Sequence, residues 1–186
     1  MQKQPKTPTD LLNKVAEILN NLRIDFFVSG GFAVSVWGRP RFTADIDLVI
    51  YLEEKNINQL AGKLKNEFPD AYIDSLQMRD ALKNNGEFNI IEPNVGMKID
   101  FWIVYNQEYD KLRLRRSIKR NIGREVRFIS PEDLIISKLQ WMQNDPSSRH
   151  IEDIRSVLEI TKVDKSYLKE NVKKLGLEKR YKRIEE

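Results

Sequence analysis

Two carboxylates at the head of an apolar run are the feature that most restricts what this chain can fold into. Asp45 and Asp47 flank one isoleucine, and the apolar residues that follow predict a strand over residues 46–51. Side chains two residues apart in a strand point to the same face, and their Cα atoms are about 6.5–7 Å apart. Two like charges held side by side are costly unless a cation neutralises them, and Mg²⁺ prefers such oxygen ligands. The motif predicts a cation site, with two solvated carboxylates as the alternative.

A pair of glycines upstream interrupts two short apolar elements. Residues 26–28 predict a strand and residues 32–37 a short helix, with Ser29, Gly30 and Gly31 between them. Glycines leave the backbone N–H groups open, and the start of a helix favours an anion. Ser29 or the Gly31 amide would then hold a terminal phosphate. A plain tight turn is the alternative for this pair taken alone.

A third carboxylate stands inside a strand that is otherwise apolar. Asp100 lies in the run over residues 97–104, among isoleucine, phenylalanine, tryptophan and valine. A carboxylate in such a strand needs a partner. A neighbouring strand would set it beside Asp45 and Asp47, and three carboxylates can bind the two divalent ions of in-line nucleotidyl transfer. Asp100 would be the general base or a ligand of the activating metal, and an ion pair with Lys98 or an arginine is the alternative.

The order of the elements indicates the fold class. Thr9 and Asp10 open a first helix, the segment over residues 111–120 begins as a helix, and Ser130 and Pro131 give a strong helix start. The other expected helices cover residues 53–68, 74–83, 130–143, 145–160 and 164–176, and the other expected strands cover residues 88–91, 97–104 and 125–129. Mixed strands and helices precede helices alone, which predicts an α+β fold. We expect an α/β core over residues 1–129 and a C-terminal helical extension over residues 130–186, packed on that core.

Composition excludes several classes of protein. The chain has 186 residues, no cysteine and one histidine, which excludes disulfide frameworks, thiolate zinc sites and cysteine nucleophiles and disfavours a Ser-His-Asp hydrolase. No apolar run approaches the roughly 20 residues that a membrane span needs. The first ten residues lack a hydrophobic signal core. A cytoplasmic protein with no membrane partner is therefore expected.

The net charge of +4 and the pI of about 9.2 suggest a nucleic-acid partner, but the charge is unevenly distributed. The net charge is −4 over residues 1–110, +7 over residues 111–127, −3 over residues 128–160 and +4 over residues 161–186. The predicted cation site therefore lies in an acidic half. The two basic segments are candidate contacts for a phosphate-bearing acceptor, and a solvated helix face explains the first of them equally well.

Together these motifs resemble the nucleotidyltransferase superfamily related to DNA polymerase β. The resemblance rests on residues 28–31, on Asp-Ile-Asp over residues 45–47 and on residues 98–101. Residues 30–49 are similar to a phrase of abortive-infection toxin and minimal nucleotidyltransferases, in which Gly-Gly precedes Arg, Thr and Asp-Ile-Asp-Leu-Val. Residues 130–139 and 149–154 are similar to two later phrases of these proteins, although His150 stands where many relatives have an acid. The resemblance covers about residues 8–160.

The resemblance implies a nucleotidyltransferase fold, a small mixed β-sheet flanked by helices. It implies that Mg²⁺, or Mn²⁺, is held by three carboxylates and that the triphosphate is bound by the glycine turn with two cations nearby. These residues are Asp45, Asp47 and Asp100 for the metal and catalysis, and Ser29, Gly30, Gly31, Arg41 and Lys138 for the nucleotide. Lys138 is as well explained as a solvated helix lysine, Arg39 and Arg41 as exposed loop arginines, and Arg149 with Asp153 as a helix-surface pair.

The resulting hypothesis is an enzyme that moves a nucleoside monophosphate from a nucleoside triphosphate to a hydroxyl. The acceptor is open between a protein, an RNA and a small molecule. A toxin–antitoxin or phage-defence system, with a cognate antitoxin or toxin, is the expected setting. The alternatives are a non-catalytic nucleotide- or partner-binding module of the same fold and a basic nucleic-acid-binding protein. Trp37, Trp102 and Trp141 are interpreted as core or rim residues, and His150 as a structural residue.

Overall fold

A six-stranded mixed sheet forms the centre of the molecule in the computed structural model, which describes residues 5–104, 108–142 and 148–185. Its order is β3-β4-β2-β1-β6-β5. The strands are β1 (Phe26–Val28), β2 (Asp45–Ile50), β3 (Glu87–Glu92), β4 (Met97–Ile103), β5 (Ile118–Asn121) and β6 (Glu125–Phe128). β2 runs parallel to β4, and β1 runs parallel to β6, whereas the other neighbours are antiparallel. The predicted α+β fold is confirmed.

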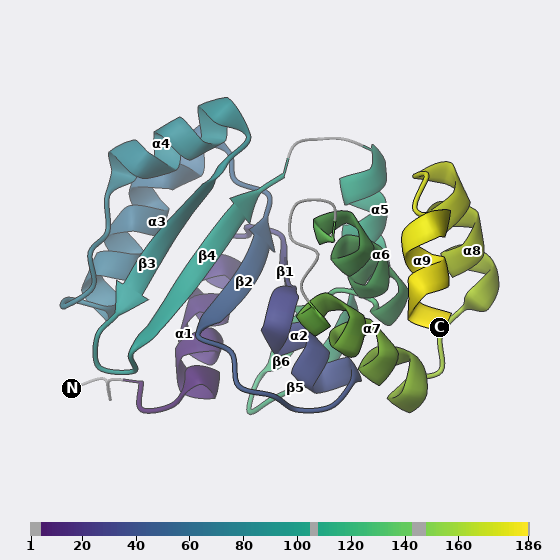
Figure 1. Ribbon diagram of the computed structural model, residues 1–186. Coiled ribbons are helices and arrows are strands. Elements are labelled where there is room, and N and C mark those ends of the chain that lie inside the picture. The colour runs from purple at the N-terminus through teal and green to yellow at the C-terminus, as the bar shows by residue number, and fades with distance from the viewer. Residues whose placement is uncertain (1–4, 105–107, 143–147, 186) are drawn as a thin grey trace.

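Helices cover the back of the sheet and its right-hand end, as Figure 1 shows, and leave the front of β3, β4 and β2 open. They are α1 (Pro8–Asn21), α2 (Gly30–Trp37), α3 (Glu54–Glu67), α4 (Ser75–Asn84), α5 (Glu108–Arg116), α6 (Pro131–Trp141), α7 (Ser148–Ile160), α8 (Lys165–Lys174) and α9 (Glu178–Glu185). The alternation of β2 turns Ile46, Leu48 and Ile50 into the core, where each is fully buried. The opposite face of β2 is thereby left for polar side chains.

Two helix starts differ from the prediction. α1 begins at Pro8, before the predicted Thr9, because Thr7 and Asp10 form a reciprocal capping box. Asp10 therefore occupies the third helical position, and its side chain accepts from the N–H of the capping residue Thr7 at 3.1 Å. α2 begins at Gly30, two residues before the expected start, since the glycine turn itself is the first turn of the helix.

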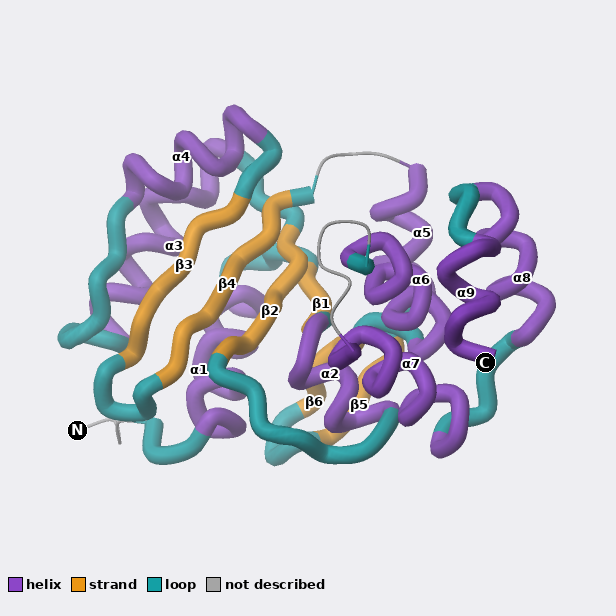
Figure 2. The backbone as a smooth tube through the Cα atoms, in the orientation of Figure 1, coloured by secondary structure: helices purple, strands orange, loops and turns teal. Residues whose placement is uncertain are grey.

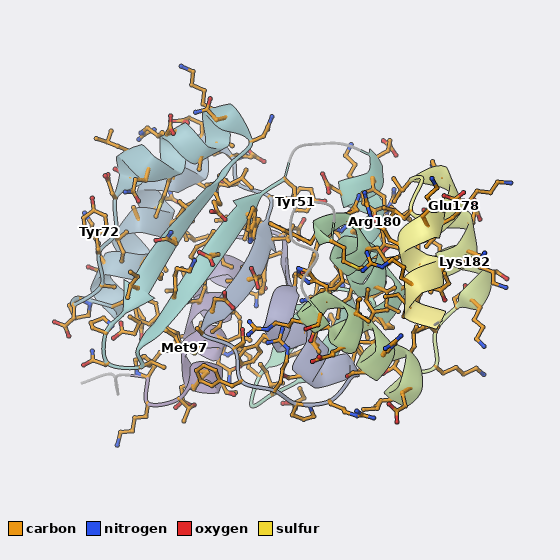
Figure 3. All side chains as sticks on the ribbon, viewed as in Figure 1. Tyr51, Tyr72, Met97, Glu178, Arg180 and Lys182 are labelled. Atoms are coloured by element: carbon orange, nitrogen blue, oxygen red, sulfur yellow. The ribbon has the colours of Figure 1, made fainter. Side chains whose placement is uncertain are left out.

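The C-terminal part contains one more helix than was expected among the described residues. Ser130 caps α6 as predicted, with Oγ accepting from the Asp133 N–H at 3.1 Å. The predicted start of the next helix at Asp145 lies outside the described residues. α9 was expected to be a charged tail. On this helix Arg180 faces α6 and donates to the Leu139 carbonyl at 3.3 Å, whereas Glu178 and Lys182 point away (Figure 3).

The basic segment at residues 111–127 is largely built into the fold. It begins as a helix, as expected, since it forms the end of α5, and it then continues into the hairpin β5–β6, of which only the second strand was predicted. Arg116 pairs with Glu132 at 3.1 Å and lies over the Tyr167 ring, and Arg124 pairs with Glu17 at 2.7 Å. Much of the surplus positive charge here therefore holds elements together. Within the described residues, no helix combines the length and apolar character needed to cross a bilayer.

Candidate active site

The three predicted carboxylates lie on one face of two neighbouring strands. The parallel register of β2 and β4 pairs Asp47 with Asp100 and Asp45 with Lys98. Since side chains on paired positions point to the same side, all four face away from the apolar core. They line a cleft of about 1070 Å³ whose walls come from β2, β4, α2 and α6. Figure 2 shows the backbone of these four elements near its centre. The remaining predicted site residues also line it, namely Ser29, Gly30, Gly31, Arg41 and Lys138.

Gly30 allows the backbone of α2 to approach β2 closely. Its φ is +57°, and a Cβ there would overlap the carboxylate of Asp47. The preceding amide of Ser29 donates to the Asp47 carbonyl at 2.8 Å. Ser29 makes no side-chain capping bond with the first turn of α2. The turn is therefore packed against Asp47, and the start of a helix, which favours anions, faces the cleft.

The ionisation of Asp47 is perturbed by its surroundings. Burial raises the pKa of Asp47, and the neighbouring charges of Asp45 and Asp100 raise it further. Asp100 is 4% exposed, and its Oδ1 has no hydrogen-bond partner. Its Oδ2 lies 2.8 Å from Nζ of Lys98. The ion pair proposed as an alternative for Asp100 thus exists, but it satisfies one of the two carboxylate oxygens.

These residues suit a divalent cation, although the side chains are not arranged around one. Among the described residues, no group of three carboxylates or histidines is close enough to hold a metal ion. Thr43 donates to Asp45 at 2.6 Å, Trp102 donates to Asp47 at 3.2 Å, and Lys98 forms an ion pair with Asp100. The unpartnered Oδ1 of Asp100 and the mutual repulsion of the three acids nevertheless call for positive charge, and an all-oxygen set matches Mg²⁺ or Mn²⁺.

A second buried acid joins the two predicted phosphate-binding cations. Asp153 of α7 is 3% exposed and accepts hydrogen bonds from Nε and Nη2 of Arg41 at 2.7 and 2.9 Å. Nζ of Lys138 lies 2.8 Å from the same carboxylate. Although burial opposes it, the hydrogen bond from Arg41 and the charge of Lys138 lower the pKa of Asp153. Both cations are thus fixed at the cleft by one carboxylate.

A family model described as "Nucleotidyl transferase AbiEii toxin, Type IV TA system" matches residues 15–185. The chain belongs to the AbiEii family. The resemblance to abortive-infection toxin nucleotidyltransferases is therefore confirmed, and so are the prediction of a nucleotidyltransferase and that of a toxin-system protein. No curated protein matches the chain in sequence.

Solved nucleotidyltransferases share the fold. The solution structure of the antibiotic-resistance factor ANT(2'')-Ia aligns over 95% of this chain and 94% of its own, with a TM-score of 0.57 at 16% identity. The lincosamide antibiotic adenylyltransferase LnuA, with lincomycin bound, aligns over 84% and 100% with a TM-score of 0.57 at 12% identity. A nucleotidyltransferase-like protein from Paracoccidioides brasiliensis aligns over 82% and 74% with a TM-score of 0.53 at 22% identity. At these identities the likeness concerns the fold.

For this AbiEii-family chain, the interpretation of Asp153 as the partner of Arg149 on a helix surface was wrong. Asp153 is buried and turned toward Arg41 and Lys138. Lys138, with 8% of its surface exposed, is likewise no solvated helix lysine. The match of residues 149–154 to a motif of the family was the signal that could have singled out Asp153. Arg39, by contrast, pairs with Glu159 on the surface.

Two of the three tryptophans line the cleft. Trp37 is a core residue, 3% exposed, whose Nε1 donates to the Ile129 carbonyl at 2.8 Å. Trp102 and Trp141 contact each other edge to face, with centroids 5.4 Å apart. Trp102 was interpreted as a core or rim residue, and its hydrogen bond to Asp47 was missed. The signal was its position two residues after Asp100, which sets it on the same face of β4.

Proposed function

We propose that this protein transfers a nucleoside monophosphate from a nucleoside triphosphate to a hydroxyl, with Mg²⁺ or Mn²⁺ held by Asp45, Asp47 and Asp100. The observation that carries the proposal is the register of β2 and β4, which aligns Asp47 with Asp100 on the face that lines the cleft. Carboxylates on neighbouring strands, beside the start of a helix, are the arrangement expected for in-line displacement at a phosphate. The AbiEii family description supports the same reaction type.

Each set of side chains has a role in this reaction. The triphosphate binds at Ser29 and the first turn of α2, with Arg41 and Lys138 facing its charge. A divalent cation bound by the carboxylates neutralises the triphosphate and makes the attacking hydroxyl more acidic. The hydroxyl oxygen forms a bond to the α-phosphorus, the bond from that phosphorus to the β-phosphate oxygen breaks, and pyrophosphate leaves. Asp100 takes the hydroxyl proton as general base, because its Oδ1 has no other hydrogen-bond partner.

We further propose that the acceptor is an RNA. The basic segment at residues 111–127 is largely engaged within the fold. The lysines of α8 and α9, by contrast, are exposed and can contact the phosphates of an RNA. These lysines are Lys165, Lys169, Lys173, Lys174, Lys179 and Lys182. A protein or small-molecule acceptor is the alternative. Since the family is described as a toxin of type IV toxin–antitoxin systems, we also propose a cognate antitoxin as the functional partner.

The test is a transfer assay with each of the four α-labelled nucleoside triphosphates, Mg²⁺, and either total RNA or an RNA-depleted protein extract. We expect label in RNA, and loss of labelling with Asp47→Asn. Asp80→Asn is the matched control, because Asp80 is an exposed carboxylate of α4 that accepts a hydrogen bond from Asn84 at 2.9 Å. Label in protein would replace the RNA proposal. Tight binding of nucleotide without transfer would favour the non-catalytic module.

A further inference from the structure

An exposed indole stands at the end of a helix whose first nine residues are buried. Residues 131–139 of α6 are all buried, yet Trp141 near its end is 47% exposed and lines the cleft. A large aromatic surface left in water loses the stabilisation that burial would bring. The placement is therefore costly for the free protein and suggests a ligand that covers the ring.

A second indole fixes the position of the first. Trp102 of β4 shares its sheet face with Asp100, and its Nε1 donates to Oδ1 of Asp47 at 3.2 Å. Its ring meets that of Trp141 at 76°, the edge-to-face geometry that aromatic pairs prefer. Asp47, Trp102 and Trp141 thus form a continuous series of contacts that leads from the carboxylates to the exposed ring.

The helix that carries Trp141 also carries a phosphate-binding candidate. Lys138 precedes Trp141 by three residues, and side chains at this spacing lie on the same face of a helix. Lys138 is held by Asp153 at the cleft. From β2 across to the end of α6, the cleft therefore presents carboxylates, a cation and then an aromatic surface. The carboxylates and the cation correspond to the metal-bound phosphates of a nucleotide, and the aromatic surface beyond them corresponds to its base.

We propose that Trp141, supported by Trp102, is the stacking platform for the base of the nucleoside triphosphate. The proposal rests on the proposed function for the position of the triphosphate. Aromatic side chains bind bases through their faces, and such stacking tolerates any base because each has a π-face. Trp102 acts as a positioning residue, and Trp141 contacts the base. Phe42 is the competing candidate, because it is 89% exposed and also lines the cleft. It follows Arg41 directly, and so belongs to the phosphate side.

The test compares two ligands by isothermal titration in the presence of Mg²⁺. One is a nucleoside triphosphate analogue with a methylene bridge between the α- and β-phosphates, and the other is inorganic tripolyphosphate, which has no base. We expect Trp141→Ala to weaken binding of the analogue about tenfold, or about 1.4 kcal/mol, and to leave tripolyphosphate binding unchanged. Trp141→Phe should recover most of the affinity. Tyr72→Ala, which removes an aromatic residue 65% exposed on the far side of the sheet from α6 (Figure 3), is the control and should have no effect.

Three results would overturn the proposal. Equal weakening of both ligands by Trp141→Ala would mean that the indole only supports the fold. Unchanged binding of both ligands would mean that no base lies on it. If Phe42→Ala, and not Trp141→Ala, removed the base-dependent part of the affinity, the base would stack on Phe42. Base-dependent binding through Trp141 in a protein that transfers no label would uphold the platform while refuting the enzyme, so the two failures are distinguishable.

Discussion

Nζ of Lys98 lies 2.8 Å from Oδ2 of Asp100, on the sheet face that also carries Asp45 and Asp47. The hydrogen bond to Asp100 raises the pKa of Lys98, so the ammonium stays charged at neutral pH. It therefore acts as the internal counter-charge of the acidic cluster. A divalent cation that binds Asp100 competes with it for the same carboxylate.

Removal of this ammonium should strengthen metal binding. We predict that Lys98→Met binds Mn²⁺ roughly three- to tenfold more tightly, because Asp100 no longer has an ion pair to lose. Electron paramagnetic resonance titration of free Mn²⁺ measures this affinity. Lys119→Met is the matched control, since Lys119 pairs with Glu125 on the β5–β6 hairpin, outside the cleft. Unchanged or weaker Mn²⁺ binding by Lys98→Met would show that Asp100 is not a metal ligand.

Gly30→Ala should abolish transfer. The new Cβ would overlap the carboxylate of Asp47, and φ at +57° is unfavourable for alanine. Gly96→Ala is the control, because Gly96 has a φ of +67° and open space around it. Both variants should lose about 1 kcal/mol of unfolding free energy from the dihedral alone, with a further loss for Gly30→Ala. Urea unfolding and initial transfer rates separate the two effects, and full activity of Gly30→Ala would refute the role given to this turn.

Asp153→Asn should cost both stability and activity. It leaves the cations of Arg41 and Lys138 without their shared carboxylate, and loss of one partner from a buried ion pair costs about 3 kcal/mol. Glu159→Gln, which removes the exposed partner of Arg39, should cost about 0–1 kcal/mol. Thermal unfolding of the two variants gives the comparison. Equal small losses would mean that Asp153 does not hold the two cations.

The contribution of Asp153 should depend on pH. Its pKa in the folded protein lies below the ordinary value of 3.8. Its ionised form therefore stabilises the fold fully above that value, and the stabilisation is lost as the pH falls through the folded-state pKa. The difference in unfolding free energy between wild type and Asp153→Asn should stay constant from pH 7 to 5 and shrink below about pH 4. A difference that instead grows in acid would contradict this assignment.

Local patterns predicted the acidic face well. The alternation of side chains along a strand depends only on residues close in sequence. The shared orientation of Asp45 and Asp47, and the glycine turn before them, could therefore be predicted from a few residues. The pairing of Asp47 with Asp100 needed a guess about which strands are neighbours, and the register of β2 and β4 supports that guess. The boundary between a core and an extension at residue 130 stays a prediction.

Contacts that join distant segments could not be predicted in the same way. Arg41 and Asp153 are 112 residues apart in sequence, and an acid four residues after an arginine on one helix looked like a surface pair. The exposed end of α6 was equally hidden, because the burial of residues 131–139 depends on α7, α8 and α2 packing around them. Charge also concealed α9, because few of its residues are apolar: Ile184 and the preceding Leu177 are buried, and Tyr181 packs against the core.

The central claim is that the carboxylates on β2 and β4 carry out nucleotidyl transfer. The most direct measurement is release of pyrophosphate, followed together with transfer of α-label to acceptor, by wild type, Asp47→Asn and Asp80→Asn at saturating Mg²⁺. The account predicts equal amounts of pyrophosphate and transferred label for wild type and Asp80→Asn, and at least a thousandfold loss of both for Asp47→Asn, about 4 kcal/mol of transition-state stabilisation. Transfer by Asp47→Asn at the wild-type rate, with folding intact, would contradict it.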